Sequence, residues 1–85
     1  MKLPMKARVL VSFKSTVLDP QGETVCSALH SLGHAGIRSV RQGKFFDIGL
    51  DGTVTREQAQ KEIELIAHDV LANPVIEEYR VEILD

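Results

Sequence analysis

The chain has 85 residues, of which 44% are hydrophobic and 26% are charged, and its formal net charge is −2. This length accommodates one domain with a small core, and the composition is that of a globular protein. The slightly acidic charge argues against a protein that mainly neutralises phosphates, and no apolar run approaches the roughly 18–20 residues that cross a bilayer. Because a single cysteine excludes an internal disulfide, we expect a partner subunit to supplement the small core.

The N-terminal residues carry little pattern. Residues 1–4 are an unpatterned lead-in to a single domain that spans 1–85. Lys2, Pro4 and Lys6 interrupt any apolar region of the kind that a secretory signal needs. Together with the lone thiol, which suits a reducing compartment, this predicts a cytoplasmic protein.

Apolar and polar residues alternate over residues 5–14, which predicts a half-buried strand. The apolar positions are Met5, Ala7, Val9, Val11 and Phe13.

A helix is expected to follow, because Asp19 can cap free N–H groups and Pro20 suits a first helical position. Gly33 and Gly36 are typical of a helix end. One apolar stripe runs along this helix at i, i+3, i+4 and i+7, and consists of Val25, Ala28, Leu29 and Leu32.

Residues 37–51 are expected to be extended, since Phe46, Ile48 and Leu50 alternate with polar positions. Two interpretations of the first half of this segment remain open. A turn at Gln42-Gly43 would make a hairpin of two strands, which we favour. Alternatively, Gly43 marks a bulge or bend in one long strand.

A second helix is predicted from Thr55, which forms a Thr-x-x-Gln capping box with Gln58. It must end at or before Asn73, because Pro74 excludes its predecessor from helical geometry. Its buried stripe is expected to contain Ala59, Ile63, Ile66, Ala67 and Val70. A last strand is predicted from the alternation of Tyr79, Val81 and Ile83 with charged residues.

The resulting order of elements is β-α-β-(β)-α-β. Two amphipathic helices each need a sheet face to cover, so the pattern predicts an α+β, ferredoxin-like sandwich. Its two helices would lie on one face of a mainly antiparallel sheet.

No set of residues predicts catalysis. Cys26, His30 and His34 fall at i, i+4 and i+8 and could line one helical face, as zinc ligands do, but no fourth ligand is indicated and a solvated face is the preferred interpretation. Basic residues around Gly43 precede Phe45 and Phe46, yet adjacent strand residues point to opposite faces, which disfavours an RNA-stacking surface. The residues alone therefore indicate a noncatalytic binding or assembly module, with no metal site and no nucleic-acid or membrane partner.

Three segments together carry a more specific signature. They are Leu18-Asp19-Pro20-Gln21-Gly22, Val40-Arg41-Gln42-Gly43-Lys44 and Leu71-Ala72-Asn73-Pro74-Val75-Ile76-Glu77. In this order, behind a Val-Leu-Val strand and in a chain of this length, they closely resemble the PurS family. PurS is the small subunit of phosphoribosylformylglycinamidine synthase, a ligase of purine biosynthesis. The similarity runs from about Met5 to Leu84.

The resemblance implies a role in the glutamine-dependent conversion of formylglycinamide ribonucleotide (FGAR) to formylglycinamidine ribonucleotide (FGAM). In that family a large synthetase subunit binds ATP and Mg, and a glutaminase subunit releases ammonia. The small subunit is expected to bridge these two, to form a homodimer or homotetramer, and to bind no cofactor itself. An ACT-like regulatory module that binds a small metabolite remains the alternative, and a ligand-dependent rise in melting temperature would favour it.

The matched residues fall into two groups. Backbone geometry accounts for one group, which we interpret as structural: Asp19, Pro20, Gly22, Gly43, Asn73, Pro74, Val75 and Ile76. The sequence offers no backbone role for the other group, which are the candidate subunit contacts: Gln21, Arg41, Lys44 and Glu77.

Overall fold

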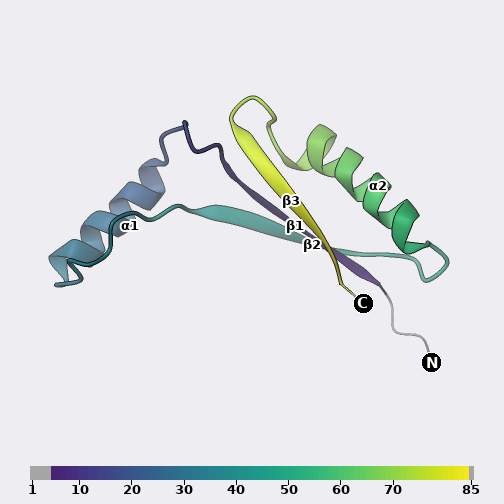
Figure 1. Ribbon diagram of the computed structural model, residues 1–85, viewed down its shortest axis with the longest axis horizontal. Helices are drawn as coiled ribbons and strands as arrows, with labels where there is room; N and C mark the ends of the chain where they lie inside the picture. Colours follow the sequence, from purple (N-terminus) through teal and green to yellow (C-terminus); the bar gives the residue numbers. More distant parts are fainter. Residues whose placement is uncertain (1–4, 85) are drawn as a thin grey trace.

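The computed structural model describes residues 5–84, so the predicted lead-in at 1–4 lies outside the described residues. Its elements are β1 (Lys6–Phe13), α1 (Pro20–Ser31), β2 (Gly43–Gly49), α2 (Arg56–Ile66), the π-helical turn η1 (Ala67–Leu71) and β3 (Glu77–Leu84). The strands form one sheet in the order β2-β1-β3, and both pairs are antiparallel (Figure 1). The α+β class and the antiparallel sheet are therefore confirmed.

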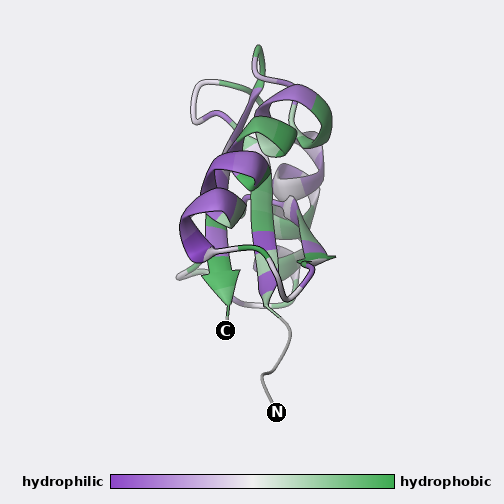
Figure 2. Ribbon diagram, turned by 90° about the vertical axis from the view of Figure 1, so that its right-hand side faces the viewer, coloured by the Kyte–Doolittle hydropathy of each residue, from purple (hydrophilic) through white to green (hydrophobic). Residues whose placement is uncertain are grey.

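The core lies between one face of this sheet and α2. Ala7, Val9 and Val11 point to that face and are at most 1% exposed. On β3 the register places Ile83 beside Ala7, and Ile83 is also buried. From α2 and η1, three small or branched side chains complete the contact, namely Ala59, Ile63 and Ala67. Figure 2 shows both hydrophilic and hydrophobic stretches on α2, and the buried residues of this helix are Ala59 and Ile63.

Within residues 5–84, no helix lies over the opposite face of the sheet, which we call the open face (Figure 1). It carries every second residue of each strand, so that Leu10 of β1 lies between Phe45 of β2 and Arg80 of β3. Phe45 is 58% exposed, whereas the neighbouring Phe46 points to the α2 side and packs against the core. The expectation that these two rings face opposite ways is confirmed.

The position of α1 differs from the expected sandwich. It projects beyond one end of the sheet instead of lying on it beside α2 (Figure 1), and Gly22 is its only buried residue. The molecule consequently measures 51 × 32 × 14 Å, with a radius of gyration of 16.7 Å against about 12 Å for a compact domain of this length. Of the helices within residues 5–84, none is long and apolar enough to span a membrane.

The favoured hairpin at 37–51 is wrong, because only one strand forms there and it begins at Gly43. Residues 37–42 instead run back alongside α1 from Gly33, whose φ of +96° ends the helix (Figure 1). The carbonyl of Ile37 binds the His30 imidazole, and the N–H of Gln42 binds Asp19. Backbone groups that a hairpin would pair with each other are thus committed to the α1 region.

The second helix begins as predicted, with reciprocal bonds of 3.2 Å between Thr55 and Gln58 that form the capping box. Its end is different. The N–H of Ala72 bonds the carbonyl of Ala67 at 2.9 Å, five residues back. This wider turn moves the buried side by one position, so Leu71 packs against the core and Val70 is 74% exposed. The prediction that Val70 belongs to the buried stripe is therefore wrong.

Candidate functional site

The three sequence motifs meet at one end of the sheet, where β1 finishes and β2 and β3 begin. A shallow pocket of about 200 Å³ lies there, and we call it the junction pocket. Its lining residues are Val11, Ser12, Phe13, Asp19, Gln21, Gln42, Gly43, Lys44 and Glu77. Three of the four candidate contact residues are thus brought together from segments far apart in the chain, and Arg41 lies directly beside them.

Asp19 is the buried centre of this junction, with 3% of its surface exposed. Its carboxylate accepts hydrogen bonds from the N–H of Gln42 at 2.6 Å and from the N–H of Gly22 at 3.0 Å. The first bond fixes the entry to β2 and the second caps α1. The Gln42 bond, followed by the Gly22 bond, lowers the pKa of Asp19 below its ordinary value, since both stabilise the charged form.

Arg41 has a structural role that the sequence did not reveal. Its Nη2 donates to the backbone carbonyls of Lys14 and Val17, each at 3.0 Å. These carbonyls belong to the loop between β1 and α1, so Arg41 binds that loop to the segment that enters β2. Asp19 and Arg41 therefore connect the same two segments, namely the loop between β1 and α1 and the segment that enters β2. Asp19 makes its bond from the first of these segments, and Arg41 makes its bonds from the second.

We expect Arg41→Ala to lower the free energy of unfolding by about 1–2 kcal/mol, because two hydrogen bonds from a charged donor are lost at an exposed position. Urea unfolding monitored by circular dichroism measures this. Arg41→Lys keeps the charge and has three N–H donors, but its side chain is one bond shorter, so it should recover only part of the loss. An unchanged urea midpoint for Arg41→Ala would show that these bonds add no net stability.

The third motif is held by Glu77 and Asn73. Glu77 Oε1 accepts a 2.7 Å hydrogen bond from the N–H of Asn73, and its Oε2 lies 4.0 Å from Nζ of Lys44. The Asn73 Oδ1 in turn accepts from the N–H of Val75 at 3.1 Å. Glu77 therefore stabilises the turn that leads into β3, whereas the long Lys44 contact leaves most of that side chain in solvent.

Gln21 and Lys44 are the two candidates that hold no loop by a hydrogen bond, and Nζ of Lys44 lies 5.8 Å from the centre of the Phe46 ring. Both are exposed, and Gln21 lies on the first turn of α1. Gln42 also lines the junction pocket, although its place beside Gly43 predicts a turn. The signal for a site role is its position within the second motif, between Arg41 and Gly43.

Cys26 and His30 are brought together, as their i, i+4 spacing indicated, with Sγ 3.9 Å from Nε2. His34 does not join them, because α1 ends at Ser31. The same Nε2 lies 2.5 Å from the Ile37 carbonyl oxygen, which only accepts, so this nitrogen carries its proton and cannot take one from the thiol. In the described part of the chain, no group of three or more His, Cys, Asp or Glu residues could hold a metal ion.

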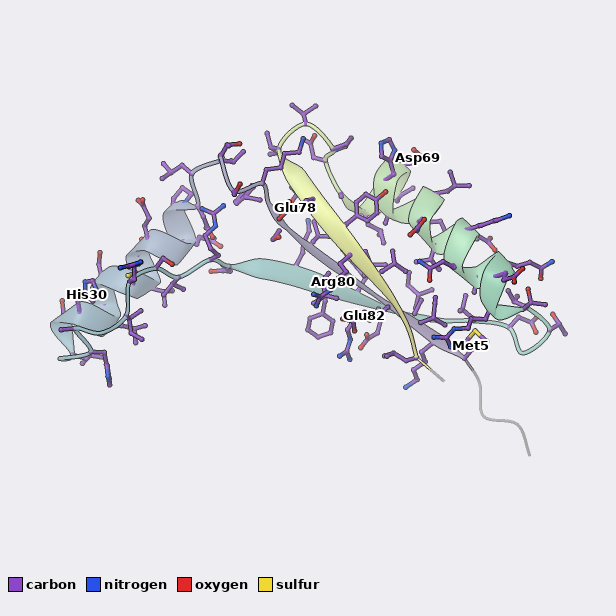
Figure 3. The ribbon with its side chains drawn as sticks, viewed as in Figure 1. Met5, His30, Asp69, Glu78, Arg80 and Glu82 are labelled. Carbon is purple, nitrogen blue, oxygen red and sulfur yellow. The ribbon has the colours of Figure 1, made fainter. Side chains whose placement is uncertain are left out.

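The open face carries paired charges and a shallow depression. Arg8 makes two hydrogen bonds to Asp47, at 2.8 and 3.2 Å, and its guanidinium lies 4.8 Å from the centre of the Phe45 ring. The bond from Arg8 lowers the pKa of Asp47. On β3, Arg80 pairs with Glu82 at 3.1 Å (Figure 3). Such solvated pairs contribute little to stability.

Comparison with known proteins agrees with the motifs. The family model of PurS, phosphoribosylformylglycinamidine (FGAM) synthase, matches residues 6–85. The PurS subunit of Mycobacterium leprae is 43% identical over 76 residues, which cover 89% of this chain and 91% of that protein. That of Bacillus subtilis is 38% identical over 82 residues, which cover 92% and 90%.

Solved structures extend the match to three dimensions. PurS from Methanocaldococcus jannaschii superposes with a TM-score of 0.85 at 33% identity, covering 95% of this chain and 96% of that one. A chain in the structure of PurLQS from Thermotoga maritima gives 0.81 at 29% identity, covering 96% and 100%. Since the family model matches nearly the whole chain and the relatives agree with it in sequence and in fold, the chain belongs to the PurS family of FGAM synthase subunits.

Proposed function

We propose that this chain is the noncatalytic small subunit that bridges the large synthetase and the glutaminase of FGAM synthase. The glutamine-dependent conversion of FGAR to FGAM then depends on it for assembly. The large subunit supplies ATP and Mg binding, while this chain binds no cofactor. We also propose that it associates with further copies of itself and works in the cytoplasm.

One observation carries the proposal: the three motifs that mark the family converge on the junction pocket. Three of the motif residues, Asp19, Arg41 and Glu77, have a structural role, because their side chains hold loops in place by hydrogen bonds. Gln21 and Lys44 hold no loop in place, yet they lie at the same pocket with exposed side chains. A binding role for this end of the sheet accounts for both.

The test is glutamine-dependent turnover by the three subunits at limiting concentrations. Omission of this chain should abolish it, while turnover with free ammonia by the large subunit should suffer less. Gln21→Ala and Lys44→Ala should each leave stability within about 0.5 kcal/mol, as for exposed side chains generally. At least one of the two should weaken assembly by about tenfold, or about 1.4 kcal/mol.

Lys61→Ala is the matched control, since Lys61 is an exposed lysine on α2, away from the junction pocket. It should support full turnover. If the Gln21 and Lys44 variants also behave as wild type, the junction pocket is not the contact with the other subunits. If turnover is unchanged when this chain is omitted, the bridging role itself is wrong.

A further inference from the structure

The exposed charge at the junction pocket is positive. Its two carboxylates are covered, since Asp19 is 3% exposed and the Glu77 side chain is 16% exposed. By contrast, the Lys44 side chain is 55% exposed. Arg41 beside the pocket is also exposed, and its hydrogen bonds go to neutral backbone carbonyls. A partner that approaches this end of the sheet therefore meets cations before anions.

Charge is divided unevenly along the chain. Residues 1–46 contain seven basic and two acidic residues, whereas residues 47–85 contain three basic and ten acidic residues. The helical segment over the core belongs to the acidic half, and its exposed acids are Glu57, Glu62, Glu64 and Asp69. An acidic partner is thus attracted to the junction and repelled along α2, which orients it before contact.

Lys44 and Gln21 have unused hydrogen-bond donors. Nζ of Lys44 carries three N–H groups, yet its ion pair with Oε2 of Glu77 is long, at 4.0 Å. Within residues 5–84, the side chains of Lys44 and Gln21 make no hydrogen bond. Both residues line the pocket, which therefore offers donors from α1 and from β2 to an acceptor that a partner supplies.

The size and the backbone of the pocket favour a carboxylate over a phosphate or a cofactor. Its volume of about 200 Å³ lies below the roughly 300–1,000 Å³ that is typical of small-molecule sites, so it suits one side chain. Phosphate sites use free backbone N–H groups, as at helix N-termini, but here those of Gly22 and Gln42 already donate to Asp19. A phosphate would also bring about two negative charges close to Glu77, whereas a carboxylate brings one.

We propose that the junction pocket binds an aspartate or glutamate side chain from an acidic segment of a partner subunit of FGAM synthase. Nζ of Lys44 pairs with the carboxylate, and the amide of Gln21 donates a hydrogen bond to it. Arg41 adds positive potential while it continues to hold its two carbonyls. This inference rests on the proposed bridging function and gives the chemistry of that contact.

The sign of the charge at position 21 tests the proposal. When the large subunit is limiting, titration of this chain into the glutamine-dependent assay gives an apparent Kd for assembly. Gln21→Glu should give a Kd about tenfold above that of Gln21→Lys, because the two variants place charges of opposite sign against the partner's carboxylate. Lys61→Glu is the matched control, since it changes the charge by the same amount on α2, and it should change the Kd less than about twofold.

Salt dependence gives a second readout. Raising KCl from about 0.1 to about 0.3 M should raise the wild-type Kd several-fold, because salt screens an exposed ion pair. Lys44→Gln lacks that pair, so its Kd should be about tenfold higher than that of wild type in low salt and should change less with KCl. Circular dichroism shows that each variant compared is folded.

The outcomes separate this contact from the bridging function. A Gln21→Glu chain that assembles as well as Gln21→Lys, or equal salt dependence of wild type and Lys44→Gln, overturns the acidic contact and leaves the bridging function standing. Competition by millimolar inorganic phosphate at constant ionic strength, if Lys44→Gln abolishes it, makes the pocket a phosphate site and also overturns the contact. Turnover that persists without this chain overturns the bridging function, and the contact with it.

Discussion

Gly22→Ala should lower the free energy of unfolding by about 3 kcal/mol. This value is at the upper end of the range of about 1–3 kcal/mol that is typical when a methyl-sized group is added to a packed site. A Cβ at this position would lie well inside contact distance of the Val40 carbonyl oxygen and 2.7 Å from Oδ2 of Asp19. Neither neighbour can retreat cheaply, because one is backbone and the other is held by Gln42. Since a domain of this length has a total stability of about 4–13 kcal/mol, the melting temperature should fall by about 12 °C or more.

The sign of this effect is informative. By helix propensity alone, alanine in place of a glycine inside α1 would stabilise the protein by up to about 1 kcal/mol. Gly36→Ala is the matched control, since a Cβ there meets nothing within 4 Å and the backbone φ is not positive. Thermal unfolding of both variants decides the matter. A Gly22→Ala protein that melts at or above the wild-type temperature would mean that α1 does not lie against the Val40 segment.

Asp19→Asn should remove much of the dependence of stability on pH in the acid range. Because hydrogen bonds from Gln42 and Gly22 lower the pKa of Asp19 in the folded state, the unfolded chain binds its proton more readily. The stabilisation is therefore present above the ordinary aspartate pKa of 3.8 and is lost as pH falls through the lower folded value. Urea midpoints between about pH 2 and pH 5 should fall steeply for wild type and less for the variant.

Asp47→Asn is the comparison variant, since the pKa of Asp47 is also lowered, by its bonds to Arg8. That pair lies on the open face with about half of the Asp47 side chain exposed, so its share of the acid dependence should be smaller. Above pH 5, Asp19→Asn should also be less stable than wild type, because an amide in place of the carboxylate places an NH₂ group against one of the two donors. Parallel curves for wild type and Asp19→Asn would contradict this account of the junction.

Local signals in the sequence predicted the parts of the fold that depend on near neighbours. Alternation predicted β1 and β3, and the Asp19 cap and the Thr55–Gln58 box predicted the starts of both helices. The sequence did not predict which residue is buried at the end of the second helix. The difference between Val70 and Leu71 as the buried residue depends on one i+5 hydrogen bond, which leaves no distinct composition in the sequence.

Features that depend on distant partners could not be predicted. A stripe such as that of α1 indicates that a helix needs cover, but it does not say which surface provides it. Gln42-Gly43 is typical of a hairpin turn, and the sequence does not show that Asp19 accepts the Gln42 N–H instead. Likewise, the sequence does not reveal the structural role of Arg41, because the carbonyls that it binds lie 24 and 27 positions away.

The central position of β1 has a consequence for the order in which the protein can fold during synthesis. β1 is made first, yet both of its neighbours come later, and β3 is the last element of the described chain. Until residues 77–84 have left the ribosome, one edge of β1 is unpaired and Val9 and Val11 lack the β3 side of their core. We therefore expect a nascent chain arrested before Glu77 to be sensitive to protease, and protection to begin only once β3 has emerged.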